Sequence, residues 1–136
     1  MLQPKLQPKA FHCRVVLHLD DDATELLLME SLLQQWGESV VYYPDKNATA
    51  FFRTFETLPH ADAILLDYNL NDPNINGFDV LAWLRDRGFD QTIIMLSSSR
   101  DIIRQPCFQR YHARYLHKDE VNCHQLSQHL MLPAYG

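Results

Sequence analysis

The sequence predicts an α/β protein built on a parallel sheet. Short apolar runs rich in branched residues alternate along the chain with longer segments that carry apolar residues at helical spacing. The first run, RVVLHL, is continuous rather than alternating, which is typical of a strand covered on both faces. Strands that alternate with helices form βαβ units, and their right-handed connections place helices on both faces of the sheet.

Five apolar runs are the predicted strands: residues 14–19, 40–43, 63–66, 93–96 and 113–117. The helices between and after them are recognised by apolar residues on one face, namely Leu26, Met29, Leu33 and Trp36; Ala48, Phe51, Phe52 and Phe55; Phe78, Leu81 and Leu84; and Val121, Leu126 and Leu130. Gly37 stands where the C-cap of the first helix is expected. Pro106 interrupts residues 100–111, which predicts either a helix that begins near this proline or a loop before a short one.

Length and composition indicate one domain with a short extension. The chain has 136 residues, of which 46% are hydrophobic, and this is enough for one core but not two. Residues 1–12 contain the tract LQPKLQPK and are expected to be a flexible extension, which leaves residues 13–136 as the domain. No stretch is apolar enough for a membrane span or a secretory signal, so we expect a cytoplasmic protein that does not bind membranes.

Cysteine use and charge exclude two further classes of protein. The three cysteines are widely separated and match neither a disulfide framework nor a zinc site. The net charge is −5 and the basic residues are scattered, whereas binding to nucleic acid needs a clustered basic surface. We therefore expect no nucleic-acid partner.

Polar side chains follow four of the predicted strands, at the edge of the sheet where α/β folds place their working sites. They are Asp20 and Asp21 after the first strand, Asp67 after the third, Ser97 after the fourth and Lys118 after the fifth. A single acid at a strand end is usually solvated or structural, and Asp22 with Glu25 has the spacing of a capping box. The convergence of carboxylates, a hydroxyl and an amine on one edge favours a site.

Such a group of residues suits Mg²⁺-dependent phosphoryl transfer. Carboxylates that lie together repel one another and favour a hard divalent cation with oxygen ligands. One carboxylate can attack phosphorus in line, while Lys118 and Ser97 interact with the phosphoryl oxygens. The product would be an acyl phosphate, which adds charge at a strand end.

The motifs LHLDDD, AILLDYNL with NGFDVL, IIMLSSS and RYLHK, in this order, resemble the receiver domains of two-component response regulators, such as the single-domain chemotaxis regulators. The resemblance covers residues 14–130. It implies a flavodoxin-like, doubly wound fold of five βα units with a five-stranded parallel sheet in the order 2-1-3-4-5. It also implies that a sensor histidine kinase or a His-phosphotransfer protein is the phosphodonor, and that a downstream protein is the target.

The resemblance also assigns roles to individual residues. Asp67 matches the phosphoacceptor, and Asp20 and Asp21 match the acidic pair that binds Mg²⁺. Asn69 matches the residue whose backbone carbonyl contacts the metal. Ser97 and Tyr115 match the pair that moves on phosphorylation, and Lys118 matches the lysine that contacts the phosphoryl group. Because the chain ends soon after the last helix, we expect a stand-alone receiver and no enzyme beyond self-catalysed phosphotransfer and autodephosphorylation.

Three departures from the family pattern bear on the loops. Asp119 stands where receivers usually have a proline in a cis peptide bond, so this loop is either strained or trans and differently shaped. The loop at residues 69–77 is longer than usual, and the region around Pro106 replaces a normally regular helix.

Two other interpretations stay open at this point. The first is a receiver-like interaction module that works without phosphorylation, which the departures in the loops suggest. The second is a phosphatase of the haloacid-dehalogenase type, because residues 20–24 also satisfy the pattern DxDxT. In that enzyme Asp20 would attack and Asp22 would act as general acid, but Asp67 would have no role.

Overall fold

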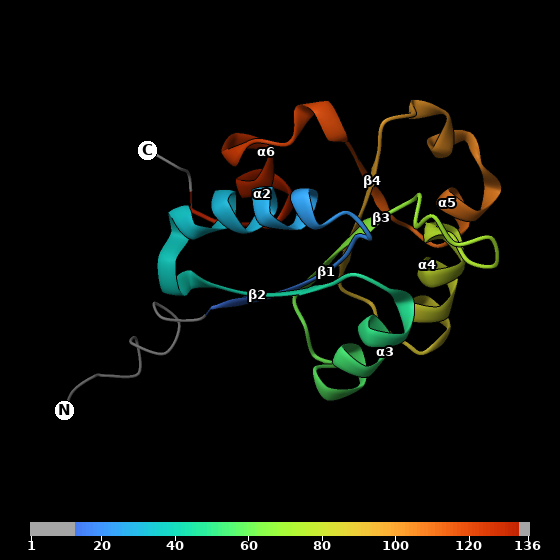
Figure 1. Ribbon diagram of the computed structural model, residues 1–136, viewed down its shortest axis with the longest axis horizontal. Helices are drawn as coiled ribbons and strands as arrows, with labels where there is room; N and C mark the ends of the chain where they lie inside the picture. Colours follow the sequence, from blue (N-terminus) through green and yellow to red (C-terminus); the bar gives the residue numbers. More distant parts are fainter. Residues whose placement is uncertain (1–12, 134–136) are drawn as a thin grey trace.

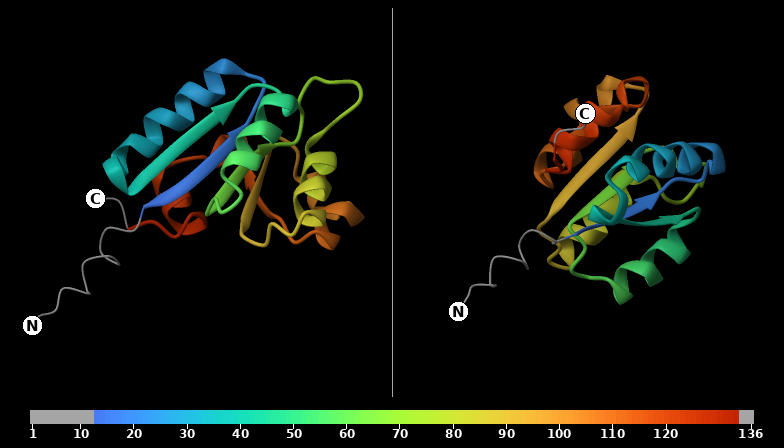
Figure 2. Two further views of the ribbon diagram at one scale, coloured as in Figure 1. Left: turned by 90° about the horizontal axis from the view of Figure 1, so that it is seen from below. Right: turned by 90° about the vertical axis from the view of Figure 1, so that its left-hand side faces the viewer.

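The computed structural model describes residues 13–133 and contains a parallel five-stranded sheet. The strands are β1 (Arg14–Leu19), β2 (Val40–Asp45), β3 (Ala63–Asp67), β4 (Thr92–Ser97) and β5 (Arg114–His117). Their order in the sheet is β2-β1-β3-β4-β5, and Figure 2 shows the twist of the sheet from two directions. The α/β class and the strand order are as expected from the sequence. Residues 1–12, expected to form an extension, lie outside the described part of the chain.

Helices cover both faces of the sheet (Figure 1). The α-helices are α2 (Ala23–Leu33), α3 (Ala48–Thr57), α4 (Gly77–Asp86), α5 (Pro106–Arg110) and α6 (Cys123–His129). The 3₁₀ segments are η2 (Gln34–Ser39), η3 (Arg100–Arg104) and η4 (Lys118–Glu120). Within residues 13–133, no helix is long and apolar enough to cross a membrane.

Two apolar cores form because successive side chains of a strand point to opposite faces. Leu17 and Leu19 of β1 pack with Phe51 of α3 and Leu81 of α4 on one face. Val16, on the other face, packs in a cluster with α2 and α6. Burial on both faces explains why the strands read as continuous apolar runs.

The end of the first helix differs from the sequence prediction, and the region around Pro106 agrees with it. The first helix ends at Leu33, and Gly37 lies four residues further on, in a 3₁₀ segment, with a φ of 55°. Trp36 therefore leaves the helix, and its indole nitrogen donates to the Pro133 carbonyl oxygen at 2.9 Å. Residues 100–111 hold the short η3 and then a helix that starts at Pro106, which combines the two alternatives left open.

Candidate functional site

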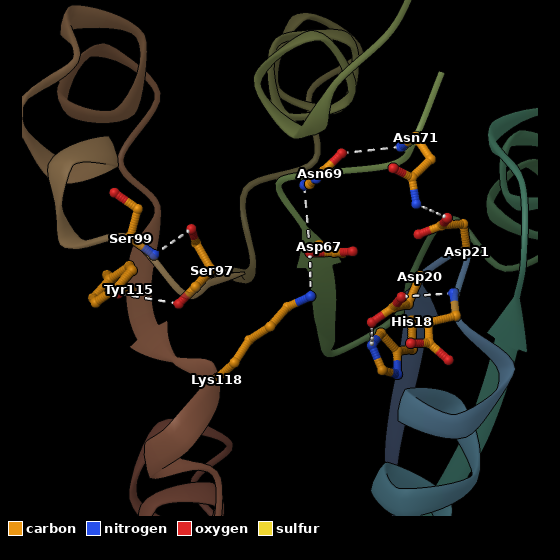
Figure 3. Close-up of polar contacts among 11 residues, drawn as sticks. His18, Asp20, Asp21, Asp67, Asn69, Asn71, Ser97, Ser99, Tyr115 and Lys118 are labelled. Carbon is orange, nitrogen blue, oxygen red and sulfur yellow. Dashed lines mark hydrogen bonds and ion pairs between the residues drawn. The ribbon is translucent and has the colours of Figure 1, made fainter. Parts of the chain in front are cut away.

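The carboxyl ends of the strands bring the expected site residues to one edge of the sheet. Asp67 is the last residue of β3, Ser97 is the last of β4, and Lys118 directly follows β5. Asp20 directly follows β1. Asp20, Asp67 and Ser97 are buried even though they are polar, so they lie within the site rather than on the surface around it. Figure 3 shows Lys118 reaching across toward Asp67, with Asp20 and Asp21 on the other side.

Three carboxylates meet there. One oxygen from each of Asp20, Asp21 and Asp67 lies within 4.8 Å of the others. Asp20 is held through Oδ1, which accepts from the Asp22 backbone N–H at 2.9 Å. Asp67 Oδ1 lies 2.9 Å from Lys118 Nζ. The Asn69 backbone N–H donates to the same Asp67 oxygen at 3.4 Å, so Asn69 also lies at the site.

Burial and like charge set the electrostatics of this cluster. Burial, together with the nearby charge of Asp67, raises the pKa of Asp20 to about 7 against the opposing hydrogen bond from the Asp22 backbone N–H. Burial also raises the pKa of Asp67, although the hydrogen bond and charge of Lys118 oppose this rise. For Lys118, burial acts to lower the pKa, but the hydrogen bond and charge of Asp67 outweigh it and the pKa rises. The site therefore holds more negative charge than the one lysine balances.

Ser97 and Tyr115 are joined on the β4–β5 side of the site. The Ser97 hydroxyl oxygen accepts from the Ser99 backbone N–H at 3.0 Å. The Tyr115 hydroxyl donates to the Ser97 carbonyl oxygen at 3.1 Å (Figure 3). Tyr115 is therefore linked to the backbone of Ser97, and Ser99 to its hydroxyl.

A pocket opens between these two groups of residues. It has a volume of about 380 Å³ and is lined by Asp67, Tyr68, Asn69, Ser97, Ser98, Ser99 and Lys118. A carboxylate, a hydroxyl and an ammonium group face the same space, and this is enough room for a phosphoryl group on a donor side chain.

Sequence reasoning missed two contributions to the site. The Asn71 side-chain amide donates to Asp21 Oδ2 at 2.6 Å from the long β3–α4 loop, where Asn71 has a φ of 51°. His18 is bonded to the Tyr42 hydroxyl, and it also lies beside Asp20. Strand alternation gave a signal for His18, since residues 18 and 20 share a face of β1. No local signal places Asn71 against Asp21, because the two are 50 residues apart.

The family of the chain follows from a comparison with known protein families. A model described as the response regulator receiver domain matches residues 16–130. The chain belongs to the response-regulator receiver family. A comparison with curated proteins gives no match.

Solved receiver structures share the fold. A receiver domain protein from Clostridium thermocellum is 23% identical, with a TM-score of 0.74, over 87% of this chain and 91% of that one. The chemotaxis protein CheY4 of Vibrio cholerae is 20% identical, with a TM-score of 0.72, over 88% of this chain and 97% of that one. A putative response regulator from Chloroflexus aurantiacus is 21% identical, with a TM-score of 0.70, over 88% and 98%. These similarities support the receiver fold.

The departure at Asp119 is resolved by a turn that differs from the usual receiver loop. No peptide bond among the described residues is cis. Residues 118–120 instead form η4, and His117 Nδ1 accepts from the Asp119 backbone N–H at 3.0 Å. A proline at residue 119 would have no N–H to donate. The hydrogen bond to His117 therefore requires a residue other than proline at this position.

Proposed function

We propose that this receiver is phosphorylated on Asp67 with the help of Mg²⁺. The observation that carries the proposal is the contact between Lys118 Nζ and Asp67 Oδ1, made beside two further carboxylates. Asp67 thus has a cationic partner, Lys118, on one side. On the other side it belongs to a group of carboxylates that would attract a cation. The roles assigned to single residues below belong to this proposal.

The donor set fits Mg²⁺. All three side chains of the cluster offer carboxylate oxygens, which a hard cation prefers, and their mutual repulsion is relieved by a divalent charge. Asp20, Asp21 and Asp67 would hold the ion together with the backbone carbonyl of Asn69. When bound, the ion neutralises charge on the phosphoryl oxygens during transfer.

The side chains of the receiver perform the remaining steps. An Asp67 carboxylate oxygen attacks the phosphorus of a phosphohistidine, a P–O bond forms, the P–N bond breaks, and the imidazole leaves with the bonding electron pair. Lys118 moves its contact from the carboxylate to a phosphoryl oxygen and stabilises the developing charge. Burial of Asp67 limits the access of competing water to the reacting atoms.

The signal is proposed to leave the site through Ser97 and Tyr115. A phosphoryl oxygen on Asp67 offers the Ser97 hydroxyl a new acceptor, which competes with its contact to the Ser99 N–H. The Tyr115 hydroxyl follows because it is bonded to the Ser97 carbonyl. Phosphorylation then shifts a pre-existing equilibrium of this surface, and a downstream protein binds the shifted state.

The partners and the location are part of the same proposal. A sensor histidine kinase or a His-phosphotransfer protein supplies the phosphoryl group, in the cytoplasm. The receiver family acts in signalling, and the chemistry proposed here is limited to self-catalysed phosphotransfer and autodephosphorylation.

Intact-mass measurement after incubation with acetyl phosphate and Mg²⁺ tests the proposal. We expect one phosphoryl adduct on the wild-type chain and none on Asp67→Asn, with the same unfolding curve for both. Asp72→Asn is a matched control in the neighbouring loop and should be labelled normally. An adduct that persists in Asp67→Asn would place the acceptor elsewhere. Absence of an adduct on the wild type, with a known receiver labelled in parallel, would support the phosphorylation-independent interaction module.

A phosphatase assay of Asp20→Asn and Asp67→Asn separates the receiver from a phosphatase. Asp22, the general acid of that alternative, accepts from the Thr24 backbone N–H at 2.9 Å as the N-cap of α2. Asp67 belongs to the carboxylate cluster, and the phosphatase interpretation gives it no role. Turnover of a generic phosphomonoester that is lost in Asp20→Asn and kept in Asp67→Asn would favour the enzyme.

A further inference from the structure

His18 is a polar side chain buried beneath the acidic cluster. It lies in β1, two residues before Asp20, and both residues have 1% of their surface exposed. Nδ1 lies 2.6 Å from the hydroxyl oxygen of Tyr42 on the neighbouring strand β2. Nε2 is buried and has no hydrogen-bond partner, and the group that it faces is Asp20 Oδ2 at 3.9 Å (Figure 3). A buried polar atom left in this way needs a physical reason, since burial takes it away from the water that would otherwise bond to it.

The tautomer of His18 decides what Nε2 can do. The ring is buried, with the Tyr42 hydroxyl against Nδ1 and the Asp20 carboxylate opposite Nε2, and a neutral imidazole carries its proton on one of these two nitrogens. Tyr42 also has a single hydroxyl proton. The Leu26 carbonyl oxygen is 3.3 Å away, whereas Nδ1 is 2.6 Å away, so the closer nitrogen is the better acceptor. If the tyrosine donates to Nδ1, the ring proton is on Nε2.

We propose that His18 and Tyr42 are a positioning pair for Asp20: the Tyr42 hydroxyl fixes the ring so that Nε2–H is aimed at the carboxylate of Asp20. This inference rests on the proposed Mg²⁺ site, because its consequence is to orient the Asp20 carboxylate for a divalent cation. Residues that donate to a metal-binding side chain from behind commonly set its orientation and its affinity.

The surroundings of Asp20 support this role. Its Oδ1 is already held by the Asp22 N–H, so Oδ2 is the oxygen that still needs a donor. A small cavity of about 20 Å³ lies on this side of the site and is lined by polar groups of His18, Asp20, Glu25 and Lys118 together with apolar residues. His18 therefore borders the acidic cluster, and its unpaired Nε2 faces a carboxylate of that cluster.

Long-range ¹⁵N–¹H spectra of the imidazole rings test the tautomer without any cation. We expect His18 to show the Nε2–H form, with its signals identified by their loss in His18→Gln. Tyr42→Phe removes the hydroxyl that fixes the ring, so the Nδ1–H form should gain population. Tyr43→Phe, on the opposite face of β2, is the matched control and should leave the ring unchanged. A predominant Nδ1–H form in the wild type would overturn the inference, because Nε2 could not then donate to Asp20.

Calorimetric titration with Mg²⁺ tests the consequence. His18→Leu should raise the Kd by about tenfold, and Tyr42→Phe should raise it less. His18→Gln can place an N–H donor near the position of Nε2 and should keep most of the affinity. Leu33→Val, at the far end of α2, controls for a general loss of core packing and should bind as the wild type does. Unchanged affinity in both His18→Leu and Tyr42→Phe would overturn the positioning role.

The two tests also separate this inference from the proposed function. If the wild-type chain binds no Mg²⁺, the proposed cation site is wrong. The tautomer measured in the metal-free protein then still decides whether His18 donates toward Asp20. If Mg²⁺ binds and the tautomer is Nδ1–H, the proposed function stands and the role of His18 is wrong.

Discussion

Lys118 balances the carboxylates in the absence of a cation and would also repel one. Its ammonium group lies 2.9 Å from Asp67 Oδ1. This contact with Asp67 raises the pKa of Lys118, whereas burial acts to lower it. The same positive charge acts on Asp20. In the proposed function, the charge of Lys118 would therefore have two opposite effects. It would weaken the binding of a cation, and it would assist phosphoryl transfer.

Lys118→Met should separate these two effects. We expect Mg²⁺ to bind more tightly by about 1 kcal/mol, or roughly fivefold in Kd, because a like charge has been removed from the site. Labelling of Asp67 by acetyl phosphate should become slower in the same variant. Calorimetry gives the first quantity and a time course of intact mass gives the second. Lys46→Met, an exposed lysine at the end of β2, loses the same charge and should change neither. Weaker Mg²⁺ binding in Lys118→Met would contradict this account of the charges.

At the scale of elements, α4 is packed directly against the end of β3, where Asp67 lies. Gly77 begins this helix, and its backbone N–H donates to the Tyr68 carbonyl oxygen at 2.8 Å. A Cβ atom at residue 77 would lie 2.7 Å from Tyr68 Cα and 2.8 Å from the Asp67 carbonyl oxygen. The close approach of helix and strand end thus depends on the absence of a side chain.

Gly77→Ala should therefore damage the site as well as the fold. The backbone at Asp67 and Tyr68 must move to admit the methyl group, which we expect to cost about 1–3 kcal/mol of unfolding free energy and to slow labelling of Asp67. Gly88→Ala is the matched control. Gly88 has a φ of 88° and nothing within 4 Å of an added Cβ, so alanine there should cost about 1–2 kcal/mol through backbone strain alone. Urea denaturation measures both losses, and equal labelling of the two variants would contradict the close-approach argument.

A second element, the turn η4, begins at Lys118 and fixes the backbone position of this lysine. The turn is capped by His117, whose Nδ1 accepts from the Asp119 N–H at 3.0 Å, and the ring of His117 meets Tyr115 edge-on. His117→Ala removes the acceptor and should cost about 1 kcal/mol while slowing the labelling of Asp67. Asn can offer an oxygen near the position of Nδ1, so His117→Asn should recover much of the labelling rate. If alanine and asparagine are equally slow, the hydrogen bond does not position Lys118.

At the scale of the whole molecule, the predictable parts are those written locally in the chain. Continuous apolar runs such as residues 63–66 specified buried parallel strands, and the polar residue after each run marked the edge where the site lies. The α2 boundary at Leu33 and the contact of Asn71 with Asp21 were not predictable, because each depends on packing between segments distant in the sequence. The role of residues 100–111 was ambiguous for the same reason, since apolar spacing there is short and Pro106 permits either start.

At the amino ends of β4 and β5, opposite the candidate site, one arginine holds two connections together. The sequence analysis did not identify this residue. Arg85, near the end of α4, donates to the carbonyl oxygens of Phe89 and Gln91 at 2.8 and 2.7 Å. It also donates to those of Tyr111 and His112 at 2.9 and 3.1 Å. These four acceptors belong to the connections that lead into β4 and β5, so a single guanidinium group ties helix α4 to both.

Arg85→Met should destabilise the whole domain while leaving the chemistry of the site in place. Four carbonyl oxygens lose a charged donor, which we expect to lower the unfolding free energy by about 2–4 kcal/mol. Arg87→Met is the control on the same helix end: this guanidinium stacks 3.8 Å from the Trp83 ring centre, and its loss should cost only about 0.5–1 kcal/mol. Urea denaturation compares the two. At temperatures where Arg85→Met is folded, Asp67 should be labelled at the wild-type rate. Arg85 lies at the amino ends of β4 and β5, whereas Asp67 lies at the carboxyl end of β3. A slower rate in the folded variant would mean that the two edges of the sheet are coupled.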